Sequence, residues 1–296
     1  MMVGMEEVEI GEGLVRSLLA DQHPDLADLT LAEADRGWDN AMWRLGDELA
    51  VRLPCRREAA PLIVNEQRWL PVLAPRLPLP VPAPVRVGRP CRGHPWPWSI
   101  VPWLPGVPAD RAPVTDRDGA GSAEMLGRFL RALHHEAPAD APYNPYRSVT
   151  LAHRADAFEA CLARLGDQVD VDGLRRIWHR AVSAGPWDRP ATWVHGDLHP
   201  ANVLVDRGTI CAVVDFGDLC AGDPATDLAG AWLLLPPSAL PGLVDAYGGV
   251  DADLERRALG WAVLFALMLL EIGLGGTPTY ATAGRLGLER AIERGA

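Results

Sequence analysis

Three side chains between residues 193 and 227 have the types and spacing that phosphoryl transfer requires. Asp197 stands in H-G-D-x-x-x-x-N, five residues before Asn202, and Asp215 follows Asn202 by thirteen residues in V-V-D-F-G. A carboxylate can orient an attacking hydroxyl and accept its proton. An amide oxygen and a second carboxylate are hard ligands for Mg²⁺ that bridges nucleotide phosphates. We therefore predict Asp197 as the catalytic base and Asn202 and Asp215 as magnesium ligands.

The elements around these residues should bring the two metal ligands together. NVLVD at 202–206 and ICAVVDF at 210–216 are short apolar runs separated by Arg-Gly-Thr. Such a pair predicts a β-hairpin with Asn202 and Asp215 at the same end.

The ordered set of H-G-D-x-x-x-x-N, apolar strand and D-F-G resembles the aminoglycoside phosphotransferase family of small-molecule kinases. That family typically has Gly where protein kinases have the Arg of H-R-D. The resemblance implies an α+β, two-lobed protein-kinase-like fold with a small antiparallel-sheet lobe and a larger, mainly helical lobe. We expect residues 1–104 to form the nucleotide-binding lobe and 105–296 the catalytic and acceptor-binding lobe. The implied cofactors are ATP, with GTP as an alternative, and Mg²⁺.

Three neighbours of the base have supporting roles in this interpretation. His195 is predicted to hold the loop through side-chain hydrogen bonds rather than to act in the chemistry, because a buried His usually has a partner. His199 is a candidate for lining the acceptor cleft. In the family, the segment that matches GDPATDLA begins a helix behind the catalytic loop, so Asp227 is expected to accept N–H bonds from that loop. Asp223 is a possible helix N-cap.

The nucleotide side departs from the family at one residue. All 28 basic residues of the chain are Arg, so the cation that is normally Lys must be Arg52 in ELAVRLP. Arg keeps the charge but is planar and bulkier. Glu66, within the apolar LIVNEQRWL, is its expected partner, because a charge among apolar residues is usually paired.

Two further segments complete the expected nucleotide site. RGWDN at 36–40 lies where the family has its phosphate-covering loop, which makes Gly37 and Asn40 candidates although the segment has a single Gly. If Gly106 matches the Gly that follows the family's hinge, adenine binds the carbonyl of Pro102 and the N–H of Leu104. Val101 then lies at the back of the pocket.

The pattern of apolar residues predicts an amino-terminal part with both strands and helices and a mainly helical remainder. The expected helix N-caps include Ser122 and Asp253. Strands are expected near 29–34, on both sides of Gly46-Asp47, and in PVRVG and WSIVPWL, and helices at 8–20, 57–74, 122–135, 151–165, 172–184, 225–235, 238–247 and 253–274.

The composition limits the classes of partner that the chain could bind. The net charge of −11 argues against a nucleic-acid binder, which needs a positive surface. The apolar run at 260–270 is shorter than a membrane span and reads as a core helix. Five Cys without a C-x-x-C pair favour a reducing, cytoplasmic location. The oligomeric state is left open between monomer and homodimer.

The formal net charge of residues 105–296 is −8, and that of residues 1–104 is −3. Most of the excess negative charge therefore lies in the larger lobe. This modestly favours a cationic acceptor such as an aminoglycoside, with Glu271 as a candidate that faces it. Choline, an amino sugar, a macrolide or another metabolite stays open as acceptor. A nucleotide-binding regulator without catalysis is a further alternative, motivated by Arg52 and the single-Gly loop.

Overall fold

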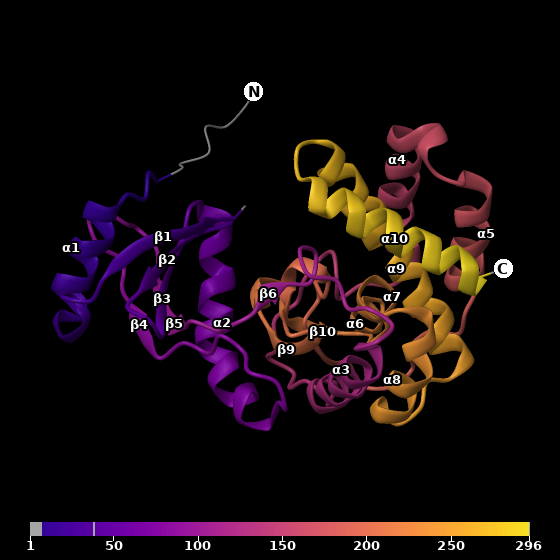
Figure 1. Cartoon of the computed structure of the whole chain (residues 1–296), viewed down its shortest axis with the longest axis horizontal. Helices are drawn as coiled ribbons and strands as arrows, with labels where there is room; N and C mark the ends of the chain where they lie inside the picture. Colours follow the sequence, from indigo (N-terminus) through magenta and orange to yellow (C-terminus); the bar gives the residue numbers. More distant parts are fainter. Residues whose placement is uncertain (1–7, 38, 296) are drawn as a thin grey trace. The chain divides into compact units, whose positions relative to one another are not determined.

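The computed structural model describes residues 8–37 and 39–295, and it divides into two compact units. Unit 1 ends at Leu104 and excludes the short segment Arg76–Leu79. Unit 2 contains that segment and the chain from Pro105 onward. The antiparallel sheet lies in unit 1 and most helices lie in unit 2, as the predicted fold class requires (Figure 1).

Unit 1 is built on an antiparallel sheet of five strands in the order β1-β2-β3-β5-β4. The helix α1 covers one face, and α2 lies against the other. The strands are β1 (Leu31–Arg36), β2 (Asn40–Leu45), β3 (Leu49–Pro54), β4 (Arg86–Gly88) and β5 (Trp98–Pro102), and the helices are α1 (Glu12–Gln22) and α2 (Ala60–Leu73).

The alternation of side chains along β3 determines which of its residues face α1 and which face α2. Successive residues of a strand point to opposite faces. Val51 and Leu53 join a buried cluster with Val15 and Leu18 of α1. Arg52, between them in the sequence, therefore points to the face of the sheet that α2 covers.

Unit 2 is mainly helical, and its longest helix, α9, runs through its centre (Figure 1). By length and composition α9 could span a membrane, but 78% of its most apolar window is buried inside the protein. It is therefore the core helix that its apolar run predicted. The helices are α3 (Gly119–Leu133), α4 (Ala155–Leu165), α5 (Val171–Val182), α6 (Ala225–Leu228), α7 (Gly230–Leu234), α8 (Leu240–Tyr247), α9 (Ala252–Leu274) and α10 (Pro278–Gly295).

Two small sheets of unit 2 carry the motif-bearing loops. One has the order β6-β8-β9 and the other pairs β10 with β7. The predicted hairpin is present as β8 and β9, and its turn residues Arg207 and Gly208 both have positive φ, as tight hairpin turns often require. The strands are β6 (Val107–Pro108), β7 (Thr192–Val194), β8 (Val203–Asp206), β9 (Thr209–Val213) and β10 (Cys220–Gly222).

One long helix was not predicted. The helix α10 packs along α9 through small residues, and a Cβ atom at Gly284 would lie 2.6 Å from the Ala266 carbonyl oxygen. Close packing through Gly leaves a weak apolar period in the sequence, so the usual signal was absent. The predicted helix 225–235 is in fact two short helices, α6 and α7. The break lets Gly230 approach Leu198 in the loop that carries Asp197.

The N-caps predicted for α3 and α9 are wrong. The cap of α9 is Asp251, whose carboxylate accepts the Leu254 N–H at 2.8 Å. Asp253 lies one residue inside the helix. Ser122 lies within α3 and its hydroxyl accepts the Ile210 N–H at 3.2 Å. In both cases the helix begins earlier than its apolar pattern does.

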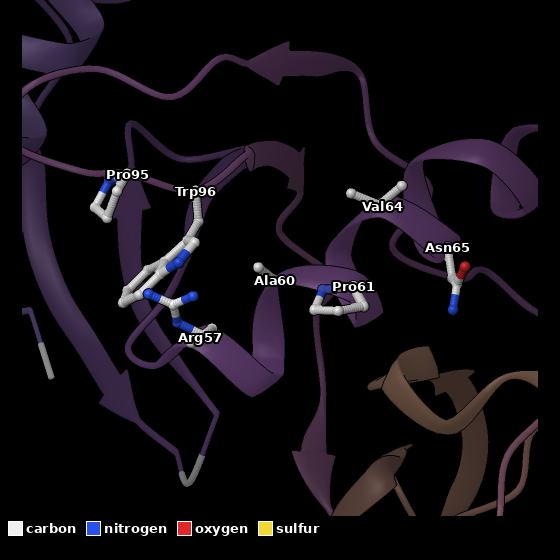
Figure 2. A pocket seen from close by; sticks show the side chains of 7 residues that line it. All are labelled: Arg57, Ala60, Pro61, Val64, Asn65, Pro95 and Trp96. Atoms are coloured by element: carbon white, nitrogen blue, oxygen red, sulfur yellow. The ribbon is translucent and has the colours of Figure 1, made fainter. Parts of the chain in front are cut away.

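A loop of unit 1 buries an unusual histidine beside a pocket. His94 is fully buried, neither ring nitrogen has a hydrogen-bond partner among the described residues, and its ring meets the edge of Trp96. Trp96 also lines an open pocket of about 580 Å³, where Figure 2 shows the Arg57 side chain beside the indole. The predicted nucleotide residues are not among those that line this pocket, which are Arg57, Ala60, Pro61, Val64, Asn65, Pro95 and Trp96.

We predict that His94 makes unit 1 sensitive to mild acid. Burial lowers the pKa of His94 from 6.5 to about 4. Unfolding exposes an imidazole that binds a proton, so stability should fall as the pH drops from 6.5 to 4 and change little from this source below 4. The loss should approach roughly 3 kcal/mol.

Urea unfolding monitored by Trp fluorescence at several pH values measures this dependence. In the His94→Leu variant, the free energy of unfolding should change much less between pH 6.5 and 4. The control variant His179→Leu, at an exposed position, should keep the pH dependence of the wild type. Equal slopes for wild type and His94→Leu would contradict the assignment.

Candidate active site

The loop that carries Asp197 is held from behind by a buried carboxylate. Asp227 is fully buried, and its two oxygens accept the backbone N–H groups of His195 at 2.6 Å and Gly196 at 2.8 Å. The Nε2 atom of His134 lies 3.2 Å from one of these oxygens. These are the backbone contacts expected of Asp227 from the sequence.

His195 fixes the same loop from the other side. Its Nε2 atom lies 3.0 Å from the Val214 carbonyl oxygen, and its Nδ1 atom accepts the Asp197 N–H at 3.2 Å. The ring is fully buried and packs against Phe216. Its hydrogen bonds thus join the loop to the residue before Asp215, which is a structural position.

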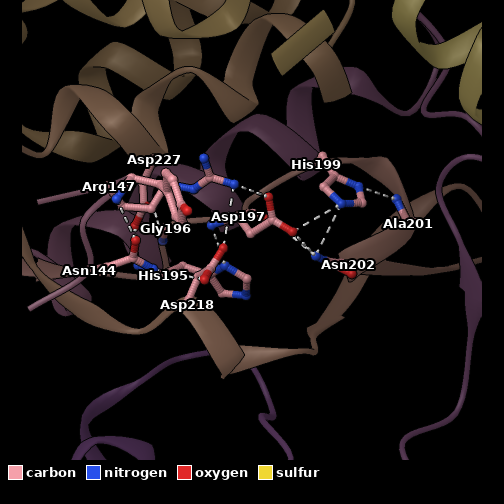
Figure 3. A network of polar contacts seen from close by, with 11 residues as sticks. Asn144, Arg147, His195, Gly196, Asp197, His199, Ala201, Asn202, Asp218 and Asp227 are labelled. Atoms are coloured by element: carbon pink, nitrogen blue, oxygen red, sulfur yellow. Dashed lines mark hydrogen bonds and ion pairs between the residues drawn. The ribbon is translucent and has the colours of Figure 1, made fainter. Parts of the chain in front are cut away.

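The Asp197 carboxylate lies at the centre of a polar network (Figure 3). His199 Nε2 is 3.3 Å from Asp197 Oδ2, and Asn202 Nδ2 donates to the Asp197 carbonyl at 2.9 Å and to Oδ2 at 3.3 Å. Partial burial alone would raise the pKa of the Asp197 carboxyl. The charges of His199 and Arg147 outweigh it, so that pKa lies well below its ordinary value. Asp197 is therefore ionised and able to accept a proton.

His199 shares this environment. Burial lowers the pKa of His199, but the Asp197 carboxylate outweighs burial and the pKa lies above its ordinary value. The ring also meets Tyr280 edge-on, with the two centroids 5.7 Å apart. His199 thus contacts the predicted base directly.

The sequence reasoning missed a cation beside Asp197. Arg147 Nη2 lies 3.1 Å from Asp197 Oδ1 and 3.4 Å from Asp218 Oδ2, and Asn144 donates to Asp218 at 2.8 Å (Figure 3). Arg147 stands fifty residues before Asp197, outside the motif segment, so spacing gave no signal for it. Asp218 follows D-F-G directly and could have been considered.

The two predicted metal ligands are held by neighbouring backbone. The Val214 N–H donates to the Asn202 carbonyl at 2.9 Å, which joins the start of β8 to the residue before Asp215. Asp215 has a φ of 60°, a left-handed conformation that costs about 1 kcal/mol for a non-Gly residue. Strain of this kind is concentrated at functional sites.

The donor set fits a hard cation such as Mg²⁺. The Asn202 amide nitrogen donates to the carbonyl and the carboxylate of Asp197 and lies 3.3 Å from His199 Nε2, so the amide oxygen is turned away from that carboxylate. That oxygen and the Asp215 carboxylate are two hard donors. Among the described residues no group of three or more His, Cys, Asp or Glu side chains could hold a metal. Two protein ligands suit an ion whose remaining ligands are phosphates and water.

In unit 1, Arg52 and Glu66 form the predicted ion pair. Arg52 Nη1 donates to the two Glu66 carboxylate oxygens at 2.6 and 2.7 Å, and both side chains are almost fully buried. The adjacent Gln67 of α2 donates to the Trp98 carbonyl at 2.9 Å and so ties the helix to β5. The guanidinium is thereby fixed on the α2 side of the sheet.

The other predicted nucleotide residues lie in unit 1 at two places. Gly37 and Asn40 flank the β1–β2 turn, where the Gly37 N–H donates to the Asn40 carbonyl at 3.0 Å; Trp38 lies outside the described residues. The Asn40 Oδ1 atom is buried without a hydrogen-bond partner among the described residues. Val101 and Pro102 end β5, and Leu104 follows. The Trp103 N–H between them donates to the Glu48 carbonyl at 2.7 Å.

Glu271, the predicted acceptor residue, is engaged in a contact between helices. Its carboxylate accepts from Arg164 Nη2 of α4 at 2.8 Å and from the Cys161 thiol at 3.4 Å. The hydrogen bond from Arg164 holds the pKa of Glu271 below its ordinary value. Its charge is therefore already paired within the protein.

Comparison with known proteins places this geometry in a family. The family model described as the phosphotransferase enzyme family matches residues 30–261. A homoserine kinase of Methylocella silvestris is 32% identical over 155 residues, which cover 48% of this chain and 44% of that protein. An aminoglycoside 3′-phosphotransferase of Streptomyces fradiae is 28% identical over 178 residues, which cover 54% and 65%. The chain thus spans less than two thirds of these relatives.

Solved structures agree on the fold. The GDP complex of wild-type aminoglycoside 2′-phosphotransferase-IIIa superposes with a TM-score of 0.69 at 17% identity, covering 96% of this chain and 100% of that one. A macrolide 2′-phosphotransferase from Brachybacterium faecium gives 0.60 at 25% identity, covering 93% and 97%. The protein-kinase-like fold class predicted from the sequence is confirmed.

We predict that Asp227→Asn destabilises unit 2 by about 2–3 kcal/mol, because an amide NH₂ would face a buried N–H donor. Thermal unfolding of wild type and variant measures the loss. Asp245→Asn, which removes the same charge from an exposed position of α8, should change stability by less than about 0.5 kcal/mol. Similar losses in both variants would refute the special role of Asp227.

Glu66→Gln should destabilise unit 1 by about 3 kcal/mol or more, because it leaves the Arg52 cation buried without its counter-charge. Glu58→Gln, on the exposed surface just before α2, is the matched control and should be near neutral. Chemical unfolding followed by circular dichroism compares the two. A Glu66→Gln protein as stable as wild type would show that the pair is not required for folding.

Proposed function

Because the chain belongs to the phosphotransferase enzyme family, we propose that it transfers the γ-phosphate of ATP to a hydroxyl of a small polar molecule. The observation that carries this is the ionised Asp197 carboxylate on a rigid loop, hydrogen-bonded to the amide of Asn202. A carboxylate in this setting can orient the acceptor hydroxyl and accept its proton as the O–P bond forms.

The residues proposed to bind the nucleotide are those that the sequence predicts. Arg52, held by Glu66, is the proposed ligand of its phosphates, and the Pro102 carbonyl and Leu104 N–H are the proposed partners of its base. Asn202 and Asp215 would hold Mg²⁺, which when bound neutralises charge on the phosphates. GTP is the alternative donor, supported by the GDP complex of a structural relative. We place the activity in the cytoplasm, where nucleoside triphosphates are available.

Three acceptor classes receive support from the comparisons, and macrolides are one of them, through a solved structure at 25% identity. The relative in Streptomyces fradiae and the GDP-bound structure carry aminoglycoside phosphotransferase names, and an aminoglycoside is the acceptor favoured by the acidic charge. Five relatives are named homoserine kinase, which supports a small zwitterionic acceptor instead. A nucleotide-binding regulator without catalysis is less well supported, because the base and both proposed metal ligands are all present.

Single-turnover transfer from γ-labelled ATP tests the proposal, with kanamycin, homoserine and a macrolide as acceptors. Asp197→Asn should lower the rate with the productive acceptor by about 10²–10⁴-fold, because the amide cannot accept the hydroxyl proton. Asp206→Asn, a charge-matched change on the exposed β8–β9 turn, should leave the rate unchanged. Equal turnover by Asp197→Asn would exclude Asp197 as the base, and ATP binding without transfer to any acceptor would favour the regulator.

A further inference from the structure

The proposed base and the carboxylate beside it share one buried cation of the protein. Arg147 lies within salt-bridge distance of both Asp197 and Asp218, at 3.1 and 3.4 Å, and it is only 7% exposed. A cationic acceptor binds through carboxylates that lack a counter-ion. At this position two carboxylates share one guanidinium, so much of their attraction for a second cation is cancelled.

Packing keeps the Arg147 charge in place. Its guanidinium lies 4.8 Å from the centre of the Phe265 ring of α9. Gly196 has a φ of 86°, and a Cβ atom there would lie 3.3 Å from Arg147 Cγ and 2.6 Å from the Asp218 carbonyl oxygen. The Gly of H-G-D therefore leaves room for the Arg147 stem behind the base. A buried, stacked guanidinium cannot swing away to admit an ammonium group.

A second cation adds to the positive potential. Arg154 packs over the Tyr146 ring at 5.1 Å, and burial together with the charge of Arg147 lowers the pKa of Arg154. Two of the acids of unit 2 are bound by Arg away from this position. Glu271 is paired with Arg164, and Asp223 with Arg257 at 2.6 Å.

We propose that Arg147 sets the charge preference of the acceptor site, so that the acceptor is a hydroxyl compound with no net positive charge and polycations are rejected. This inference rests on the proposed phosphotransferase function and narrows its acceptor. Placing like charges side by side costs enough to shift preference by about 100-fold. Among the acceptor classes supported above, the zwitterionic one meets this condition.

Initial-rate kinetics with homoserine, an uncharged sugar and kanamycin test the preference. For wild type, kcat/KM for the better of the two acceptors without net charge should exceed that for kanamycin by about 100-fold. Arg147→Gln should reduce this ratio at least tenfold, because it frees two carboxylates for an ammonium group. Arg147→Lys keeps the charge and should keep the ratio. Asp218→Asn removes a negative charge and should raise the ratio of the two kcat/KM values. This variant tests the inference even if Arg147→Gln fails to fold.

Arg128→Gln is the matched control, since it removes one Arg from an exposed ion pair on α3 and should leave every ratio unchanged. A kcat/KM for kanamycin as high as that for the acceptors without net charge would overturn the inference. It would leave the phosphotransferase proposal intact. The inference would also be overturned by an Arg147→Gln protein that loses activity equally with all acceptors, which is the result of a purely structural role. Absence of transfer to any acceptor would refute the phosphotransferase proposal itself.

Discussion

The buried carboxylate of Asp227 is the interaction on which the arrangement around the base depends. A fully buried carboxylate is costly unless its oxygens accept hydrogen bonds, and those of Asp227 accept the N–H groups of two successive loop residues, with His134 also beside one oxygen. Because these donors lie directly before Asp197, the position of the base follows from the start of α6. The segment GDPATDL thus positions Asp197, thirty residues before Asp227 in the chain.

A second constraint, steric rather than electrostatic, acts on the same loop. Gly196 adopts a positive φ and lies so close to Asp218 that a side chain there would overlap its carbonyl oxygen. The missing side chain lets Arg147 enter from a distant segment and bring a cation to the base. The Gly of the motif is therefore required for packing at the base.

Sequence reasoning predicted contacts between residues that stand close together in the sequence, and the structure shows those of Asp227 and of the Arg52–Glu66 pair. The base, the proposed metal ligands and Asp227 lie within about thirty residues, and the Arg52–Glu66 pair could be found because a charge within an apolar helix face needs a partner. It failed where partners are remote or the packing uses small residues. Arg147 and Asp218 meet only through the fold, and α10 packs on α9 through Gly284, which contributes nothing to an apolar pattern.

The acidity of the chain is also better understood from the structure. A formal charge of −11 suggests attraction for cations, but many carboxylates of unit 2 are bound by Arg side chains within the fold, including Asp223, Glu255 and Glu271. Arg binds carboxylates with a planar fork of donors and cannot be deprotonated, so a chain without Lys holds its acids firmly. The net charge of −11 then describes mainly the surface carboxylates that are not bound by Arg. The charge near the acceptor depends instead on a few buried residues. Arg147 is the residue of this kind that touches the proposed base.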